Sequence, residues 1–438
     1  MSPLSRRQLL VGGASILGGA VLAGGLTGCA TGSTAASGAD RLQFWHLLTG
    51  GDGAKMADLV KRADAATGVA AQQTVLAWGT PYYTKLAMAS VGGRAPDLAI
   101  MHASRLEGYA PGGLLDTWDD DLLAEFGVRE SDYPAAVWKK TFVDGKHYAV
   151  ALDAHPFVQF YNTDILDKAG ALGSDGRIVD ISSPDQLLEV GRAVKGVTKT
   201  HGISYGYLND GANLWRMLYT LYRQQGATMV FTPGKKAEVE KDAAMAALDF
   251  MKTMLDGDIA ANAADGGTAL AEFVTQKSGI MFTGVWDTPS MKDAKIPFDA
   301  QPIPPMYSEP AAYADSHTFV LPHQNVVDEQ KRRDAHEFVA AIVKRSLSWA
   351  QAGHIPAYNP VTDSAEYKKL LPQAHYAGAA DIANYDPQAW FTGAGSDFQT
   401  AVGNALQGVL LGQTKPEAGW DQLMGVVNKK LSEPNPAG

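Results

Sequence analysis

Short apolar strand patterns alternate with amphipathic helix patterns along the first folded part of the chain. The strand patterns cover residues 42–45, 73–78 and 98–101, and helix patterns at 56–66 and 82–90 separate them. Parallel strands need a crossover connection, which is usually a helix that packs on a face of the sheet. The alternation therefore predicts an α/β fold with a mostly parallel sheet covered on both faces.

Long helix patterns occupy much of the later sequence. Ser183 is the expected N-cap residue, and Pro184 follows at the first helical position. Gln186 stands three residues after Ser183, which is the position of the Glu or Gln in a capping box. This pattern predicts a helix over residues 186–194. Three further helices are expected at 241–255, at 329–352 ending at Gly353, and at 421–431. The chain contains no repeat of fixed period, which disfavours solenoids and propellers.

Size and charge limit the class of protein. The chain has 438 residues with 46% hydrophobic side chains, enough to build more than one core, so two lobes are expected. The formal net charge is -10, and the longest basic run is only Lys331-Arg332-Arg333. A short basic run on a helix is usually a solvated face, so we expect no nucleic-acid partner.

The N-terminal residues have the composition of an export signal. The pair Arg6-Arg7 precedes an uncharged stretch, Val11 to Gly28, which ends in Leu-Thr-Gly before Cys29. We expect residues 1–28 to be a cleaved signal peptide that uses the twin-arginine (Tat) route. Because the stretch is short and rich in glycine, it does not read as a spanning helix.

Cys29 is the only cysteine of the chain. Leu-Thr-Gly-Cys resembles the lipobox of bacterial lipoproteins, so we expect Cys29 to carry a lipid that anchors the protein to the outer face of the cell membrane. Residues 29–40, mostly Ala, Gly, Ser and Thr, then form a flexible tether. No thiol is left for a disulfide, a thiolate metal ligand or a nucleophile.

Several tryptophans lie beside polar residues in segments that read as turns. An aromatic face suits the C–H side of a sugar ring, and neighbouring carboxylates, amides and imidazoles bind its hydroxyls. Each ring could equally belong to the core, since aromatic side chains dominate core packing. The candidates are Trp45 with His46, Trp78, Trp215, Trp286 with Asp287, and Trp390.

Two short polar segments lie next to predicted strands. Asp153 and His155 follow an apolar run, and His317 precedes another. Both steps could face a cleft or be polar loop ends without a ligand, because most loop residues are not sites. Histidines 102, 147, 155 and 317 are spread singly, without the paired spacing of metal ligands, so we expect no metal and no cofactor.

Motifs of enzymes are weak. Gly202-Ile203-Ser204-Tyr205-Gly206 matches the G-x-S-x-G pattern of serine hydrolases, but a strand and a turn follow it where that motif needs a helix. Gly50 to Lys55 lacks the spacing of a phosphate-binding loop. A glycosidase is not excluded, because its two carboxylates, about 5 to 10 Å apart, can come from anywhere in the chain.

A series of short sequence motifs, in order along the whole mature chain, resembles the extracellular solute-binding proteins of family 1. These are the carbohydrate receptors of ABC importers, and maltose-binding protein belongs to them. The motifs are Phe44-Trp45-His46, residues 83–89 with 93–98, residues 108–110 with 113–115, residues 148–153, Tyr161 to Asp164, residues 279–286, and Gly353-His354-Ile355-Pro356.

The resemblance implies a two-lobed α/β fold with three hinge crossings and a ligand cleft between the lobes. Crossings are expected near Ala151, Val274 and Ser316. The expected lobes are residues 41–151 plus 275–315 and residues 152–274 plus 316–438.

The family's ligand contacts carry over onto Trp45, His46, Ser104, Arg105, Asp153 and Trp286. Where maltose-binding protein has Trp-Ala-His-Asp-Arg, this chain has Met101-His102-Ala103-Ser104-Arg105, without the stacking tryptophan and the carboxylate. The resemblance therefore does not by itself imply maltodextrin specificity. The full candidate set is Trp45, His46, Trp78, His102, Ser104, Arg105, Asp153, His155, Trp215, Trp286, Asp287 and His317.

The expected function is that of a non-catalytic binding lipoprotein, a monomer that captures a sugar or oligosaccharide outside the cytoplasm. The family implies a permease and its ATPase as partners. Two alternatives stay open. One is a receptor of the same fold for a glycerophosphodiester such as glycerophosphocholine, with Arg94, Arg105 and Arg216 around the phosphate. The other is a lipid-anchored glycoside hydrolase.

Overall fold

The computed structural model describes residues 41–436. The expected signal peptide at 1–28, the lipidated Cys29 and the tether at 29–40 lie outside these residues. Within residues 41–436, no helix has both the length and the apolar character needed to cross a membrane.

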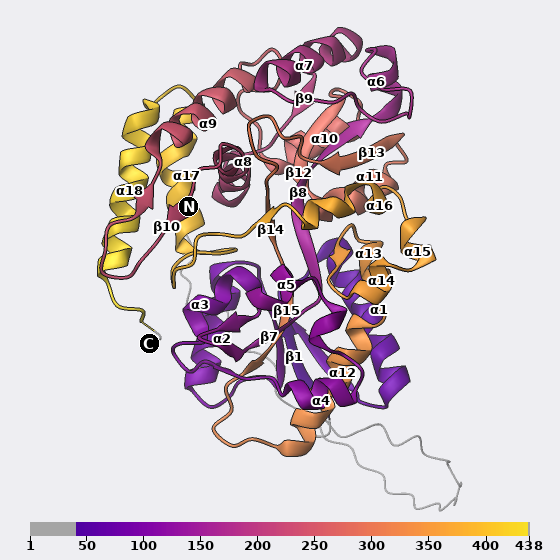
Figure 1. The fold of residues 1–438 in the computed structure, drawn as a ribbon, viewed down its shortest axis with the longest axis vertical. Helices are drawn as coiled ribbons and strands as arrows, with labels where there is room; N and C mark the ends of the chain where they lie inside the picture. The colour runs from indigo at the N-terminus through magenta and orange to yellow at the C-terminus, as the bar shows by residue number, and fades with distance from the viewer. Residues whose placement is uncertain (1–40, 437–438) are drawn as a thin grey trace, which may run out of the picture. The chain divides into compact units, whose positions relative to one another are not determined.

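The first sheet has the strand order β2-β1-β3-β15-β4, with β7 also paired to β15 (Figure 1). Strand β1 runs parallel to β2 and to β3, as the alternation predicts. Strand β15 is antiparallel to β3, β4 and β7, so the sheet is mixed. The strands are β1 Leu42–His46, β2 Ala71–Val75, β3 Leu98–His102, β4 Leu115–Asp116, β7 Ala149–Ala151 and β15 His317–Pro322.

Helices and a small hairpin surround this sheet, and one buried cluster that includes Phe44, Ile100 and Phe338 forms its core. The predicted helix at 329–352 ends early, at Val343, whose carbonyl accepts a hydrogen bond from Ser346 Oγ at 2.8 Å. The elements are α1 Gly50–Thr67, α2 Thr80–Val91, η2 Ala103–Arg105, α3 Leu106–Tyr109, α4 Asp120–Glu125, η3 Glu130–Asp132, α5 Ala135–Lys140, β5 Phe142–Val143, β6 Lys146–His147, α12 Glu329–Val343, α13 Leu347–Ala350 and α14 Asn359–Thr362.

The second sheet has the strand order β17-β14-β8-β12-β9, and β13 and β16 also pair with β8. Strand β8 is its centre, and all ten of its residues are buried. Its four partners, β12, β13, β14 and β16, all run antiparallel to it. The strands are β8 Asp153–Asn162, β9 Ile203–Ser204, β12 Ile280–Gly284, β13 Phe298–Pro302, β14 Ala312–Asp315, β16 Ile355–Pro356 and β17 Ala383–Asn384.

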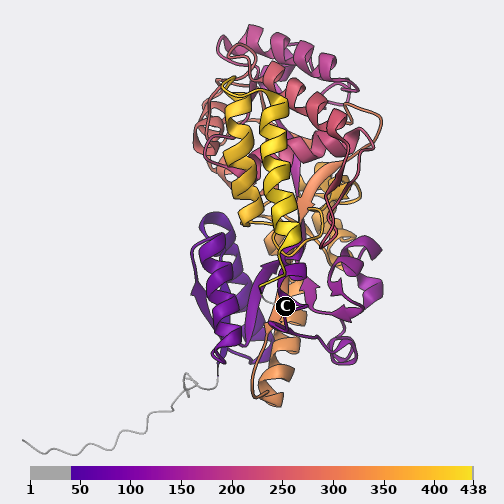
Figure 2. The same cartoon turned by 90° about the vertical axis from the view of Figure 1, so that its left-hand side faces the viewer.

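A helical layer packs on the second sheet, and Figure 2 shows its last two helices, α17 and α18, side by side. The predicted cap of α7 is present: Gln186 N donates to Ser183 Oγ at 3.2 Å, although the Gln186 side chain reaches back to Ser182 N. The elements are α6 Thr163–Lys168, α7 Pro184–Thr198, α8 Gly211–Gln224, β10 Met229–Val230, β11 Glu238–Val239, α9 Lys241–Met254, α10 Gly266–Val274, η4 Val285–Asp287, α11 Thr288–Asp293, α15 Ala365–Lys368, α16 Gln373–Tyr376, η5 Ala377–Ala380, α17 Asp397–Leu410 and α18 Pro416–Ser432.

Within the described residues, the chain passes between the two sheets three times. It does so at residues 151–153, between β7 and β8, and at 315–317, between β14 and β15, close to the expected crossings at Ala151 and Ser316. The expected crossing at Val274 is wrong, because β12 pairs with β8 and β9 of the second sheet. The third passage lies at residues 350–355, between α13 and β16.

The expected lobe boundaries change accordingly. Residues 275–315, assigned to the first lobe, contain β12, β13 and β14 of the second sheet. Strand β15, assigned to the second lobe, pairs with β3 of the first sheet, where Thr318 lies opposite Met101. The sheet that a strand joins depends on its hydrogen-bonded partners, which lie far away in sequence, so local patterning could not assign these segments.

Candidate functional site

A cavity of about 560 Å³ lies between elements of the two sheets. It opens where β1 and β3 end, at the carboxyl edge of the parallel strands, where open α/β sheets usually bind ligands. Its walls come from the β1–α1 connection, the start of α8, η4 and the crossings. The lining residues are Leu47, Leu48, Thr49, Gly51, Asp52, Trp78, His102, His155, Asn209, Asp210, Ala212, Arg216, Trp286, His317 and His354.

The cavity continues into a second one of about 780 Å³, which shares Trp78 and Asn209 with it. Here the two lobes approach closely. Thr80 Oγ1 donates to the carbonyl of Gly395 at 3.2 Å, and a Cβ on Gly395 would lie 2.6 Å from the Cα of Gly79. Glycine at Gly79 and Gly395 therefore allows the backbones to meet along the edge of the cleft.

Asp153 organises the floor of the cleft. Its Oδ1 accepts hydrogen bonds from His155 Nδ1 at 3.0 Å and from the backbone N–H of His317 at 2.8 Å. Its Oδ2 accepts from His317 Nδ1 at 2.8 Å and from Trp349 Nε1 at 2.6 Å. The carboxylate itself is fully buried behind the lining residues. It thereby holds β8, β15 and α13 together where the chain passes between the sheets.

The surroundings shift the pKa values of the floor imidazoles in different directions. Burial lowers the pKa of His102 and of His155, so both rings are neutral near pH 7. Burial opposes protonation of His354 too, but the carboxylates of Asp52 and Asp153 outweigh it and raise the pKa of His354. Burial likewise opposes the charge on Asp153, yet the histidines around it hold its pKa well below the usual range.

Neutral imidazoles give the floor hydrogen-bonding capacity toward the cleft. An ionised carboxylate only accepts, so the Nδ1 atoms of His155 and His317 that contact Asp153 carry the hydrogens. Because the His155 ring is neutral, its Nε2 atom is then an acceptor. Alcohol hydroxyls are suitable donors to such nitrogens.

An aromatic and cationic wall faces this floor. The guanidinium of Arg216, on α8, lies over the Trp286 ring at 4.6 Å and near the Tyr313 ring at 5.8 Å. Arg216 Nε is buried and has no hydrogen-bond partner. Trp78 is 47% exposed and lies at the edge shared by both cavities. The cleft thus combines indole faces with a cation and polar acceptors.

Of the twelve predicted site residues, five line the cleft and a sixth, Asp153, supports its floor. The five lining residues are Trp78, His102, His155, Trp286 and His317.

Six predicted residues lie outside the cleft lining. His46 is buried against Gln73, and Trp45 lies under Lys85 beside a separate surface hollow. Trp215 is only 1% exposed, stacks on Tyr219 and donates to Asp386. The hydroxyl of Ser104 donates to Asp315, Arg105 lies over Tyr83, and Asp287 accepts from Thr283 at 2.7 Å. The candidates Trp45 and Trp215 therefore do not line this cavity.

Sequence reasoning missed several lining residues. Asp52 belongs to a segment that reads only as a turn, and Asn209-Asp210 precede α8, where Asp210 caps the helix by accepting from Asn213 N at 2.9 Å. A polar N-cap pair before an amphipathic helix was the available signal for that wall. His354 belongs to one of the motifs that carry the family resemblance, but it is not among the predicted site residues.

The arginines expected for a phosphate do not converge. Arg216 lines the cleft, whereas Arg94 and Arg105 line other hollows. Ser204, at the G-x-S-x-G match, is buried on β9 and its hydroxyl donates to the Ile280 carbonyl at 3.4 Å.

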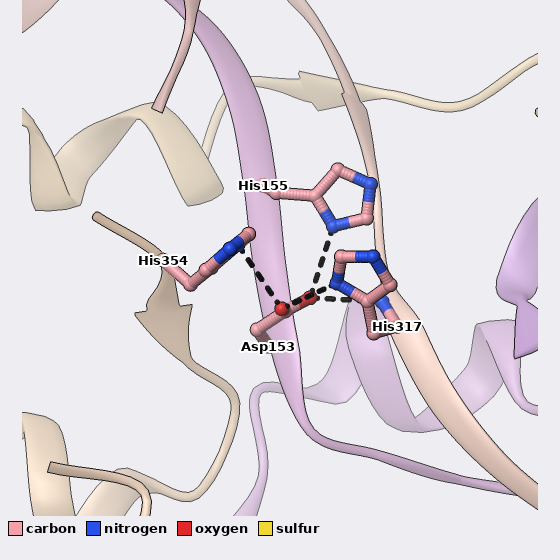
Figure 3. Close-up of side chains that lie close together, drawn as sticks. All are labelled: Asp153, His155, His317 and His354. Atoms are coloured by element: carbon pink, nitrogen blue, oxygen red, sulfur yellow. Dashed lines mark hydrogen bonds and ion pairs between the residues drawn. The ribbon is translucent and has the colours of Figure 1, made fainter. Parts of the chain in front are cut away.

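Side chains of types that can ligate a metal do come together, although they are spread singly in the sequence. Asp153, His155, His317 and His354 each offer one ligand atom, and these atoms lie within 4.8 Å of one another (Figure 3). The cluster is invisible to a motif search because three distant segments supply its four residues.

Known protein families and sequences resemble this chain. A family model described as bacterial extracellular solute-binding protein matches residues 58–374. A maltooligosaccharide ABC transporter solute-binding lipoprotein of Streptococcus pneumoniae is 21% identical over 292 residues, which are 65% of this chain and 65% of that protein. The match thus spans slightly less than two thirds of that relative.

Solved structures share the fold. The GacH receptor of Streptomyces glaucescens, studied unliganded and with acarbose, has a TM-score of 0.74 at 18% identity, over 89% of this chain and 98% of that one. A solute-binding protein of Thermotoga lettingae bound with α-D-tagatose has a TM-score of 0.73 at 17% identity, over 90% and 100%. The maltose-maltodextrin binding protein of Alicyclobacillus acidocaldarius has a TM-score of 0.69 at 17% identity, over 88% and 99%.

These likenesses confirm the two-lobed fold that the sequence predicted, and the family model covers well over half of the chain. The protein therefore belongs to the bacterial extracellular solute-binding proteins.

Proposed function

We propose that this protein is the lipid-anchored solute receptor of an ABC importer, and that it captures a sugar or oligosaccharide in the cleft between its lobes. Cys29 would hold it at the outer face of the membrane. The captured solute would pass to a permease driven by its ATPase.

The observation that carries the sugar proposal is the composition of the cleft. Trp286 and Trp78 offer flat apolar faces. The imidazoles of His155 and His317 and the polar side chains of Asn209 and Asp210 offer hydrogen-bond partners. A sugar ring has an apolar C–H face and a rim of hydroxyls, which these two kinds of group match.

The relatives bind the same class of compound. Maltooligosaccharide, acarbose and α-D-tagatose stand in the names of the proteins that this chain resembles. Their sequences differ strongly from this one, so they support the class of ligand and leave its length and linkage to experiment.

A capture mechanism follows from the two walls. Trp78, in the β2–α2 connection, and His102, at the end of β3, come from the lobe of the first sheet. Arg216, on α8, and Trp286, on η4, come from the lobe of the second sheet. A ligand that contacts both lobes favours the closed arrangement by the free energy of those contacts. Opening at the three crossings would release it.

Binding without catalysis fits the carboxylates of the cleft. A glycosidase needs two carboxylates free to act on the glycosidic bond. Asp52 is engaged by His354 Nε2 at 2.9 Å, and Asp210 caps α8. Both aspartates that line the cavity thus have structural partners.

Thermal unfolding of the purified mature protein in the presence of a ligand panel tests the proposal. The panel contains glucose, tagatose, maltose, maltotriose, acarbose and glycerophosphocholine. We expect at least one sugar to raise the melting temperature and to bind with one-to-one stoichiometry in calorimetry, because a ligand of the native state stabilises it.

Two results would contradict the proposal. Binding of glycerophosphocholine with no response to any sugar would favour the phosphodiester receptor. Release of shorter sugars during prolonged incubation with maltotriose, followed by chromatography, would show turnover and favour a hydrolase.

A further inference from the structure

Three imidazoles and a carboxylate gather where the three crossings meet. Asp153 and His155 lie on β8, His317 begins β15, and His354 precedes β16 (Figure 3). One ligand atom of each residue lies within 4.8 Å of the others, and all four side chains are buried. The nitrogen that each histidine turns toward the carboxylate is Nδ1.

We propose that this cluster is a binding site for a divalent transition-metal ion, preferably Zn²⁺, held by Nδ1 of His155, His317 and His354 and by a carboxylate oxygen of Asp153. Imidazole and carboxylate together are ligands that zinc accepts, and four protein ligands in a buried place describe a structural rather than a catalytic ion.

The distances from the carboxylate approach those around such an ion, whereas some pairs of the four ligand atoms are up to 4.8 Å apart. The Nδ1 atoms lie 3.0 Å (His155), 2.8 Å (His317) and 3.2 Å (His354) from an oxygen of Asp153. Bonds of about 2.0 to 2.1 Å in a tetrahedron place neighbouring ligand atoms about 3.3 Å apart. The imidazoles would have to rotate inward to bring all four ligand atoms to that spacing.

One nitrogen of the cluster has an ion-pair contact but no hydrogen bond. His354 Nδ1 is buried and forms no hydrogen bond, although it lies 3.2 Å from Asp153 Oδ2. A buried polar atom without a partner is unfavourable and needs an explanation. A metal bond would satisfy this nitrogen, whereas hydrogen bonds to Asp153 already account for His155 and His317.

The outer contacts are those of a metal site. His354 Nε2 lies 2.9 Å from Asp52 Oδ1, which gives the carboxylate–histidine–metal arrangement that orients metal ligands. Trp349 Nε1 donates to Asp153 Oδ2 at 2.6 Å and orients the carboxylate. Metal binding would displace the hydrogens on Nδ1 and leave these outer contacts in place.

The location implies a role in the stability of the crossings. His155 belongs to a strand of the second sheet and His317 to one of the first, and His354 lies in the third passage. An ion bound by all of them would tie the three passages at one point beneath the cleft. We expect it to raise the melting temperature whether or not a sugar is present.

The test uses the purified mature protein after treatment with a chelator, without sugar. Calorimetry with Zn²⁺ should give one ion per chain, and the ion should raise the melting temperature. Titration with Co²⁺ should give the strong visible absorption of a four-coordinate ion. His354→Gln should lower the Zn²⁺ affinity by about 100-fold or more, and Asp52→Asn by about 10- to 100-fold.

His147→Gln is the matched control. His147 is a buried histidine whose Nδ1 contacts Asp120 at 2.6 Å, and it lies outside the cluster. This variant should bind Zn²⁺ like the native protein. If His354→Gln does not fold by circular dichroism, His155→Gln takes its place, since the His155 side chain donates only to Asp153.

Several outcomes would overturn the proposal. They are the absence of stoichiometric binding, an unchanged Zn²⁺ affinity in the folded variants, and a Co²⁺ spectrum of a six-coordinate ion, which would show adventitious surface binding only. The sugar panel is independent of this test, because each ligand is titrated in the absence of the other.

Discussion

The guanidinium carbon of Arg216 lies 4.6 Å from the centroid of the Trp286 ring. The two residues come from α8 and η4, and both line the cleft. A cation over an indole face stabilises the position of both groups, so the wall is organised before any ligand arrives. Such preorganisation lowers the entropic cost of binding.

Trp286→Ala should weaken sugar binding. It removes the aromatic face and the support of Arg216, so we expect the Kd for the best sugar of the panel to rise about 10-fold or more, measured by calorimetry. The control is Trp390→Ala, since Trp390 lies under Lys430 and outside the cleft. An unchanged Kd for Trp286→Ala would remove Trp286 from the site.

Ser104→Ala should lower stability and leave affinity unchanged. The Ser104 hydroxyl donates to Asp315 and accepts from Ala394 N at 3.0 Å, so its loss leaves buried polar groups unpaired. We expect the free energy of unfolding to fall by about 1 to 3 kcal/mol in denaturant titrations. Ser348→Ala is the control, because Ser348 Oγ has no hydrogen-bond partner. A large change in Kd would restore Ser104 as a ligand contact.

Asp386→Asn should change the pH dependence of stability. Burial, with the nearby charge of Asp315, raises the pKa of Asp386 to about 6 from 3.8. The folded state therefore keeps this proton longer than the unfolded state, so the group makes stability fall as pH rises from about 4 to about 6. The full effect is about 3 kcal/mol.

Because asparagine does not titrate, the variant should gain stability relative to the native protein as pH rises over that window. Its amide can still accept from Trp215 and donate to the Tyr313 oxygen. Denaturant unfolding at pH 4, 5, 6 and 7 measures the difference, with the exposed Asp293→Asn as control. A difference that stays constant with pH would show that Asp386 has no raised pKa.

Gly353→Ala should strongly destabilise the third crossing. Gly353 has a φ of 106°, and a Cβ there would overlap the Val285 carbonyl and lie 2.8 Å from Thr288 Oγ1. We expect a loss of more than about 3 kcal/mol in the free energy of unfolding, from strain plus overlap. Gly412→Ala, with a φ of 71° and no atom within 4 Å, should cost only about 1 kcal/mol. Equal losses would contradict the close approach.

Cys29→Ala should release the protein from the membrane. The thiol is the expected site of lipid attachment, and no other cysteine can replace it. Fractionation of cells that express the full chain should move the protein from the membrane fraction to the soluble exported fraction. Ser33→Ala, a small substitution in the tether, should not. Membrane retention of Cys29→Ala would exclude the lipid anchor.

Local sequence signals predicted local structure well. The alternation at the start of the chain became β1, α1, β2, α2 and β3, with shifts of a few residues at the ends. The capping serine and proline at Ser183-Pro184 begin α7 as predicted. These features depend on neighbours within one or two turns of helix, so the sequence encodes them directly.

The sequence did not correctly predict which sheet a strand joins or which side chains face the cleft, because both depend on residues far away in the chain. Strand β12 joins the second sheet through β8, more than a hundred residues away, and no local pattern distinguishes that choice. Trp215 and Arg216 show the same limit within one helix. Successive helical residues point about 100° apart, so Trp215 enters the core while Arg216 faces the cleft. Since nearly the whole of α8 is buried, its pattern did not indicate which face would meet the ligand.

The sequence by itself determined the alternating α/β elements, the lone cysteine and the family, because each of these depends on residue type and order along the chain. Only the tertiary structure decided which lobe each late strand joins and which tryptophans face the cleft. It also brought His155, His317 and His354 around Asp153. Hydrogen-bonded pairing and packing between distant segments make those choices, and they act through space rather than along the chain.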